Sequence, residues 1–150
     1  MDKKEQLEIF PYIGAGRIKF GMQPNEVEAI FGVADSVSMN HLKQRVEFRS
    51  FMNIAYSTGD IEGVSHIGFG RQMEGVHFKG INFFLDDENG VLKRIVLADG
   101  KPFVYMGFIV LLNLGMTLTG FHDNDISQKA VALFPVGAWD KRISKLRPFL

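Results

Sequence analysis

The stretch "IKFGMQPNEVEAIFG", residues 18–32, carries the signals of a strand, a turn and a helix in immediate succession. Ile18 and Phe20 alternate with the charged residues Arg17 and Lys19, and this alternation predicts a strand with one apolar face. Gly21 then permits a turn. The stretch therefore predicts how the fold begins.

The second half of this stretch predicts a short helix. Pro24 suits the first helical position, because the N–H that it lacks would have no partner inside the helix. Val27, Ile30 and Phe31 recur at helical spacing and form one apolar stripe. Gly32 provides a stop. Every residue here has a structural explanation, so we interpret the stretch as strand, turn and helix.

The overall composition is that of a globular protein. The chain has 150 residues, of which 46% are hydrophobic and 23% charged, and this length predicts a single domain, 1–150, with its own core. Lys and Arg total 17, as do Asp and Glu. This balance gives no net attraction to polyanions, so we expect neither a nucleic-acid nor a membrane partner.

The sequence contains no cysteine, which excludes disulfides, zinc ribbons and thiol nucleophiles. Its first residues are charged and lack the apolar run of a signal peptide. The longest apolar run, around residues 108–112, is far shorter than the roughly 20 residues that span a bilayer. We therefore expect a cytoplasmic location.

Beyond residue 32 the patterns predict more strands than helices. Residues 35–44 are polar, and we expect a loop there with one turn of helix at most. Alternation and turn residues predict strands within residues 46–51, 53–57, 64–69, 76–84, 102–121 and 129–134.

Residues 86–99, "DDENGVLKRIVLAD", admit two interpretations. Asp86 or Asp87 can cap a helix whose apolar residues lie on one side. Asn-Gly between apolar runs is also a strong hairpin signal. We favour the helix, because the segment then repeats the order of strand and helix seen in residues 18–32.

Together these segments predict an α+β domain, in which a mainly antiparallel sheet carries two or three short helices packed on one face. The residues that follow strand or helix periodicity are expected to form the core: Ile18, Phe20, Val27, Ile30, Phe31, Ile67, Phe69, Ile109, Leu111 and Phe134.

Sequence motifs give no support for an enzyme. Gly14, Gly16 and Gly21 resemble a dinucleotide-binding fingerprint only loosely, because the third glycine is misplaced and the loop precedes a strand. No histidine has the spacing of a metal-ligand pair. We predict no catalytic, cofactor-binding or metal-binding residues, and no cofactor.

Two acidic turns are the candidate binding residues. Asp86, Asp87 and Glu88 form one, and Asp123 and Asp125 form the other. Side chains in turns are free to face solvent, and turns carry recognition more often than sheet interiors do. We expect both turns to contribute to a partner surface that steers a basic target. The basic run at 141–147 is the alternative interface.

The stretch 18–32 resembles the opening motif of small bacterial binding domains. The residues that carry the resemblance are Ile18, Phe20, Gly21, Met22, Glu26, Val27 and Gly32. The motif is similar to that of outer-membrane assembly lipoproteins and of the related β-lactamase-inhibitor fold, which require export. It also resembles the immunity proteins encoded beside polymorphic toxins, in contact-dependent and type VI systems, which are cytoplasmic.

Resemblance to the immunity proteins implies a non-enzymatic protein that binds and neutralises a cognate toxin domain. Two alternatives stay open. One is a small-ligand or metal-binding enzyme in which His66 or His77 meets Asp123 or Asp125. The other is a regulatory or scaffold module that dimerises through an exposed Phe-rich strand.

Overall fold

The chain folds into many short strands and few helices. The computed structural model describes residues 1–58, 62–123 and 125–149, and the side chain of Glu88 lies outside the description. In chain order the elements are β1 (Leu7–Phe10), β2 (Gly14–Ala15), β3 (Ile18–Lys19), α1 (Pro24–Phe31), β4 (Ser36–Met39), β5 (Arg45–Arg49), β6 (Met52–Thr58), β7 (Glu62–Gly70), β8 (Val76–Phe78), β9 (Ile81–Asn82), α2 (Glu88–Asp99), β10 (Phe103–Tyr105), β11 (Phe108–Leu111), β12 (Met116–Thr119), the 3-10 segment η1 (Ile126–Gln128), β13 (Ala130–Leu133), the 3-10 segment η2 (Asp140–Lys145) and β14 (Arg147–Pro148).

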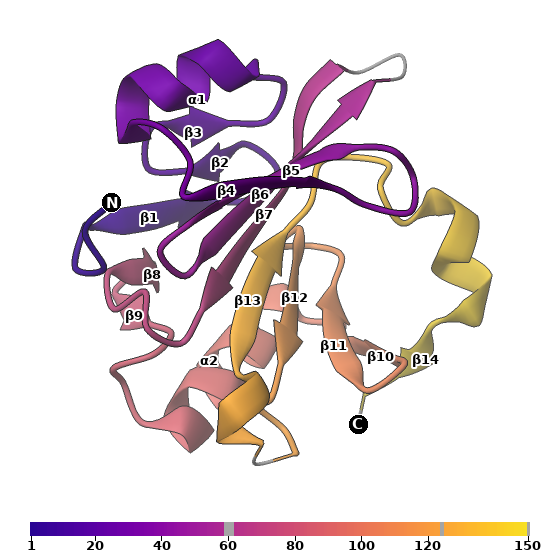
Figure 1. Cartoon of the computed structure of the whole chain (residues 1–150). Helices are drawn as coiled ribbons and strands as arrows, with labels where there is room; N and C mark the ends of the chain where they lie inside the picture. The colour runs from indigo at the N-terminus through magenta and orange to yellow at the C-terminus, as the bar shows by residue number, and fades with distance from the viewer. Residues whose placement is uncertain (59–61, 124, 150) are drawn as a thin grey trace.

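These strands form two sheets (Figure 1). The large sheet has nine strands in the order β14-β10-β11-β12-β13-β7-β6-β5-β4, and all its neighbours are antiparallel. The small sheet has the order β3-β2-β1-β8-β9, in which β1 and β8 run parallel. The prediction of an α+β fold with a mainly antiparallel sheet is confirmed.

The chain contains two copies of one supersecondary unit. A short hairpin (β2–β3) precedes α1, which the meander β4–β7 follows. A second hairpin (β8–β9) precedes α2, which β10–β13 follow. The last strands of the two meanders, β7 and β13, pair antiparallel. An approximate two-fold axis through this pair therefore relates the two halves of the large sheet, and the order of strand and helix predicted to repeat does repeat.

A single core lies between the large sheet and a second layer made of the small sheet, α1 and α2. In Figure 1 this layer runs from α1 through β3, β2, β1, β8 and β9 to α2. Val27 of α1, Ile95 of α2 and Ile9 of β1 join Ile67 and Phe69 of the large sheet in one apolar cluster. Both α-helices therefore pack on one face of the sheet, as predicted.

Most of the predicted core is buried: Ile18, Val27, Ile67, Phe69, Ile109, Leu111 and Phe134. Phe20, Ile30 and Phe31 are only partly buried, and their prediction as core is wrong. Phe20 and Phe31 pack against the edge of the cluster. In α1, a helix of eight residues, only Val27 is fully buried, and Phe20 lies in the turn between β3 and α1.

Backbone hydrogen bonds fix the turn between β3 and α1 to β7. Gly21 N–H donates to the Val64 carbonyl at 2.9 Å, and Val64 N–H donates to the Met22 carbonyl at 2.9 Å. Gly63, at a φ of 94°, has no room for a side chain, because a Cβ there would lie 2.3 Å from the Gly21 carbonyl oxygen. The Gly-Met pair of the opening motif therefore docks the first helix on the sheet.

The prediction of a loop at residues 35–44 is wrong, because β4 occupies Ser36–Met39 and pairs with β5 along its whole length. This strand forms one edge of the large sheet, and all four of its residues are exposed. Ser36 and Ser38 do alternate with Val37 and Met39, but this four-residue alternation lies within a polar segment, and both apolar side chains are exposed. The ladder of backbone hydrogen bonds to β5 forms the strand instead.

Residues 88–99 form a helix, as favoured. Asp87 is the N-cap, and its carboxylate accepts a hydrogen bond from the Gly90 N–H at 3.1 Å. Gly100 ends the helix in the left-handed conformation. The cap places Asn89 and Gly90 in the first turn, so they do not form a hairpin. Within the described ranges, no helix is long and apolar enough to cross a membrane.

A buried polar cluster distinguishes the first half of the sheet. Glu47 and Arg49 are each 2% exposed and form an ion pair at 2.7 Å. The same carboxylate accepts hydrogen bonds from the Tyr56 hydroxyl at 2.7 Å and from the Arg45 Nε at 2.8 Å. Arg49 also donates to the Gly32 carbonyl at 2.9 and 3.0 Å. The cluster thus ties the end of α1 to β5 and β6.

These contacts govern protonation within the cluster. Burial alone acts to raise the pKa of Glu47, but hydrogen bonds from Arg49, Tyr56 and Arg45 outweigh it and hold the pKa below its ordinary value. Burial, followed by the hydrogen bond to Glu47, raises the pKa of Tyr56. Glu47 is therefore ionised and Tyr56 is neutral at pH 7.

Replacing Glu47 by Gln is expected to destabilise the protein by about 3 kcal/mol or more, because the buried charge of Arg49 loses its partner. Urea unfolding at pH 7 measures this free energy. Arg45→Gln is the control, since the Arg45 side chain is 46% exposed and its loss leaves Glu47 paired with Arg49, so it should cost only about 1 kcal/mol. Equal losses of stability in the two variants would contradict the conclusion that Glu47 neutralises the buried charge of Arg49.

The same pair predicts a pH dependence. The pKa of Glu47 is lower in the folded protein than its ordinary value. Its contribution to the free energy of unfolding is therefore complete above the ordinary pKa and is lost as the pH falls through the pKa of the folded state. The wild type should therefore lose more stability between about pH 5 and pH 3 than Glu47→Gln does.

Candidate partner-binding surface

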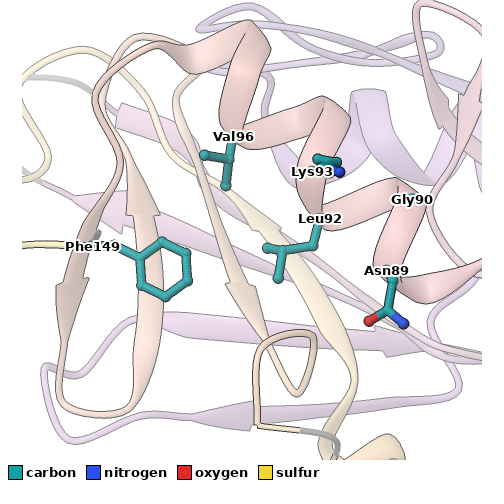
Figure 2. A pocket seen from close by; sticks show the side chains of 6 residues that line it. All are labelled: Asn89, Gly90, Leu92, Lys93, Val96 and Phe149. Carbon is teal, nitrogen blue, oxygen red and sulfur yellow. The ribbon is translucent and has the colours of Figure 1, made fainter.

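The outer side of α2 carries an apolar groove. A hollow of about 480 Å³ lies between this helix and the end of the chain, lined by Asn89, Gly90, Leu92, Lys93, Val96 and Phe149. Figure 2 shows Leu92 and Val96 extending from α2 towards the ring of Phe149. The helix buries Val91 and Ile95 on its inner side. Leu92 and Phe149 also pack against the edge of this core, so the groove lies where the apolar side of α2 meets solvent.

A second hollow of about 360 Å³ continues the groove towards the end of α2, sharing Val96 and Phe149 with the first. Leu97 lines this second hollow and is 82% exposed. Lys101 also lines it, just beyond the helix. The groove thus follows the length of α2 and has a basic side chain at this end.

The first acidic turn lies at the opposite end of the groove. Asp86 and Asp87 immediately precede α2 and are exposed, and Asn89 and Gly90 of the first helical turn line the hollow. The Asp86 carboxylate accepts a hydrogen bond from the Asn82 N–H at 2.9 Å. Arg94 lies 3.9 Å from Asp86, an exposed pair that contributes little. Glu88 begins α2, but its side chain lies outside the description.

The second acidic turn is attached to the same region by aromatic contacts. The rings of Phe84 and Phe121, which precede the two turns in sequence, lie 6.3 Å apart. The His122 ring meets the Phe149 ring edge-on at 5.7 Å. Asp123 follows directly and is exposed. The structure thus anchors both predicted acidic turns beside the groove, although no sequence pattern linked them.

Local hydrogen bonds shape the second turn. The Asp123 carboxylate accepts from the Asp125 N–H at 3.2 Å, and the Asp125 carboxylate accepts from the Ser127 hydroxyl at 2.6 Å. Lys129 is buried with its ammonium 4.7 Å from the centre of the Phe121 ring. Both aspartates are exposed, so they are available to a basic partner.

Sequence reasoning missed the apolar lining of this surface. The sequence places Val91, Leu92, Ile95 and Val96 on one side of the helix, and Leu92 does pack against the core, but Leu92 and Val96 also line the groove. A partial signal was present, because the pairs at 91–92 and 95–96 make a wider apolar stripe than Val91 and Ile95 alone would make. Phe149 had no such signal, since its position against α2 depends on the pairing of β14 with β10.

The residues of the alternative enzyme hypothesis do not meet. His66 lines a separate hollow whose walls contain no aspartate. The Nδ1 atom of His77 lies 2.9 Å from the Gly75 carbonyl oxygen. Among the described residues, no three His, Asp or Glu side chains are grouped so as to hold a metal ion.

The arrangement along α2 is suited to binding. An apolar groove with acidic side chains at one end and a lysine at the other can hold an amphipathic segment in one orientation. The sequence matches no protein-family model, and no match was found among curated proteins or among solved structures.

Proposed function

We propose that this protein is a non-enzymatic immunity protein that binds a cognate bacterial toxin domain and neutralises it. The observation that supports the proposal most directly is the apolar groove along α2 with acidic residues at one end. A partner that seats an apolar segment in the groove removes Leu97 and Phe149 from water. This burial stabilises the complex by about 25 cal/mol per Å² of apolar surface. Asp86, Asp87 and Asp123 then attract its basic side chains.

The proposal also draws on the resemblance of residues 18–32 to the immunity proteins. The turn of this motif is docked on β7 by backbone hydrogen bonds, so it serves the scaffold. A stoichiometric inhibitor requires a rigid scaffold because flexibility in the free protein reduces affinity. The α2 surface, which the motif does not include, provides the recognition in this proposal.

Cells that express a toxic domain should be rescued by this protein. The domain to test is the variable C-terminal domain of a secreted protein encoded immediately upstream. Leu97→Glu should weaken binding about tenfold or more, because a buried apolar anchor is lost, and should reduce survival. Colony counts and calorimetry measure the two effects.

Met106→Glu is the matched control, since Met106 and Leu97 are each 82% exposed and Met106 lies on the β10–β11 turn. This variant should bind and rescue like the wild type. Failure of the wild type to rescue would refute the proposed function. If the wild type rescues the cells, but the two variants lose binding equally or neither loses binding, the proposed function stands. The α2 surface is then refuted as the binding site.

Removing the acidic charge should slow association. In the triple variant Asp86→Asn, Asp87→Asn and Asp123→Asn, the amide oxygens preserve the turn and cap hydrogen bonds, because Asn caps helices as well as Asp. Stopped-flow mixing should show a lower association rate and a weaker dependence on salt. Unchanged association kinetics would show that the acidic turns lie outside the interface, and the basic run at 141–147 would be the next candidate.

A further inference from the structure

The large sheet has a second face, opposite the core, that is covered on one half only. One row of paired residues crosses this face and is symmetric about the β7–β13 pair: Ser36, Phe48, Asn53, Gly68, Ala132, Thr117, Val110 and Phe103. On the β10–β13 half, Phe134 and Trp139 bury Val110 in a separate apolar cluster. Arg142 stacks on Trp139, 3.9 Å from the ring centre.

An open trough of about 370 Å³ lies on this face over β5–β7 and the adjoining strand β13. Its floor consists of small residues, Gly68, Gly70, Ala130 and Ala132, and Phe48 and Phe51 form part of its wall. These two rings are 40% and 42% exposed. The lining contains no charged side chain other than a titratable histidine, so the trough suits an uncharged group.

Two polar side chains converge over the floor of the trough. A Cβ built on Gly68 would lie 2.9 Å from both amide atoms of Asn53 and 3.1 Å from Nε2 of His66. Both residues are partly exposed, and in the part of the chain that the structure describes neither side chain forms a hydrogen bond. Water can reach both groups in the open trough, and a ligand that hydrogen-bonds to them takes the place of that water.

A β-bulge aims His66 into the trough. His66 pairs with Ala55 and Val64 pairs with Tyr56, so the register shifts at this point and leaves Ser65 unpaired. Val64 and Ile67 consequently both face the core, and His66 faces the other way. Burial lowers the pKa of the imidazole, so the ring is neutral near pH 7. It then offers one donor and one acceptor.

We propose that this trough is a second binding site, which receives an uncharged aromatic side chain with a polar edge, tyrosine or tryptophan, from a protein partner. The covered half of the same face shows what fills an equivalent position, since the chain's own Phe134 and Trp139 occupy it. The exposed rings of Phe48 and Phe51 offer edge-to-face contacts. His66 and Asn53 pair with the hydroxyl or indole N–H. The inference does not depend on the partner being a toxin.

The probes are N-acetyltyrosinamide and N-acetyltryptophanamide, added to the ¹⁵N-labelled protein and followed by amide chemical shifts. Saturable shifts are expected at Gly68, Gly70 and Ala132. The affinity should exceed that for N-acetylphenylalaninamide about fivefold, since that probe lacks the polar edge and one net hydrogen bond is worth about 1 kcal/mol.

Variants separate the trough from a nonspecific aromatic effect. Asn53→Ala should weaken the tyrosine and tryptophan probes about fivefold and remove their advantage over phenylalanine. Thr117→Ala is the matched control, because Thr117 holds the position related to Asn53 by the approximate two-fold axis, and it should bind like the wild type. Ala132→Leu should abolish the shifts by filling the trough. Shifts that do not saturate, equal affinities for the three probes, or equal effects of Asn53→Ala and Thr117→Ala would overturn the proposal.

Discussion

The pairing of β7 with β13 joins the two repeated units, and the other features of the molecule follow from it. Ile67 and Phe69 lie opposite Leu133 and Val131 on one side of this pair, where they form the centre of the core. Because the pairing is antiparallel and the meanders extend outward from it, α1 and α2 are placed on the same face. A single core therefore serves both units.

The same pairing produces the shallow opposite face. Alternation along a strand requires that the neighbours of these apolar residues point away from the core, and they are Gly68, Gly70, Ala130 and Ala132. Larger residues at these four positions would fill the trough. The small side chains allow Asn53 and His66 to lean over the strands. Core formation and the open trough are thus two consequences of one alternating pattern.

The two units differ where they carry polar groups. Glu47 and Arg49 occupy the positions related by the approximate axis to Ile109 and Leu111, respectively. Each unit nevertheless anchors the end of its helix to the sheet. Arg49 donates to the Gly32 carbonyl after α1, and the Asn113 amide donates to the Asp99 carbonyl at 2.7 Å at the end of α2. The second unit keeps an apolar outer side on α2, which becomes the groove.

Local signals in the sequence predicted the two helices, which depend on local physics, although residues 86–99 also admitted a hairpin. Pro24 and Gly32 mark the bounds of α1, and Asp87 and Gly100 mark those of α2. The missed features depend on contacts distant in sequence. β4 exists through its pairing with β5, and Glu47 is buried because Arg49 and Tyr56 reach it. The acidic turns were identified locally, but their shared location depends on the Phe84–Phe121 contact.

Hydrogen exchange of the free protein tests most directly whether the β7–β13 pairing makes the two units one structure. If it does, the slowest amides of β6 and β7 and those of β12 and β13 should open with the same free energy, within about 1 kcal/mol, and that value should equal the free energy of global unfolding. A separate, lower opening free energy for β10–β13, with β5–β7 still protected, would contradict the account.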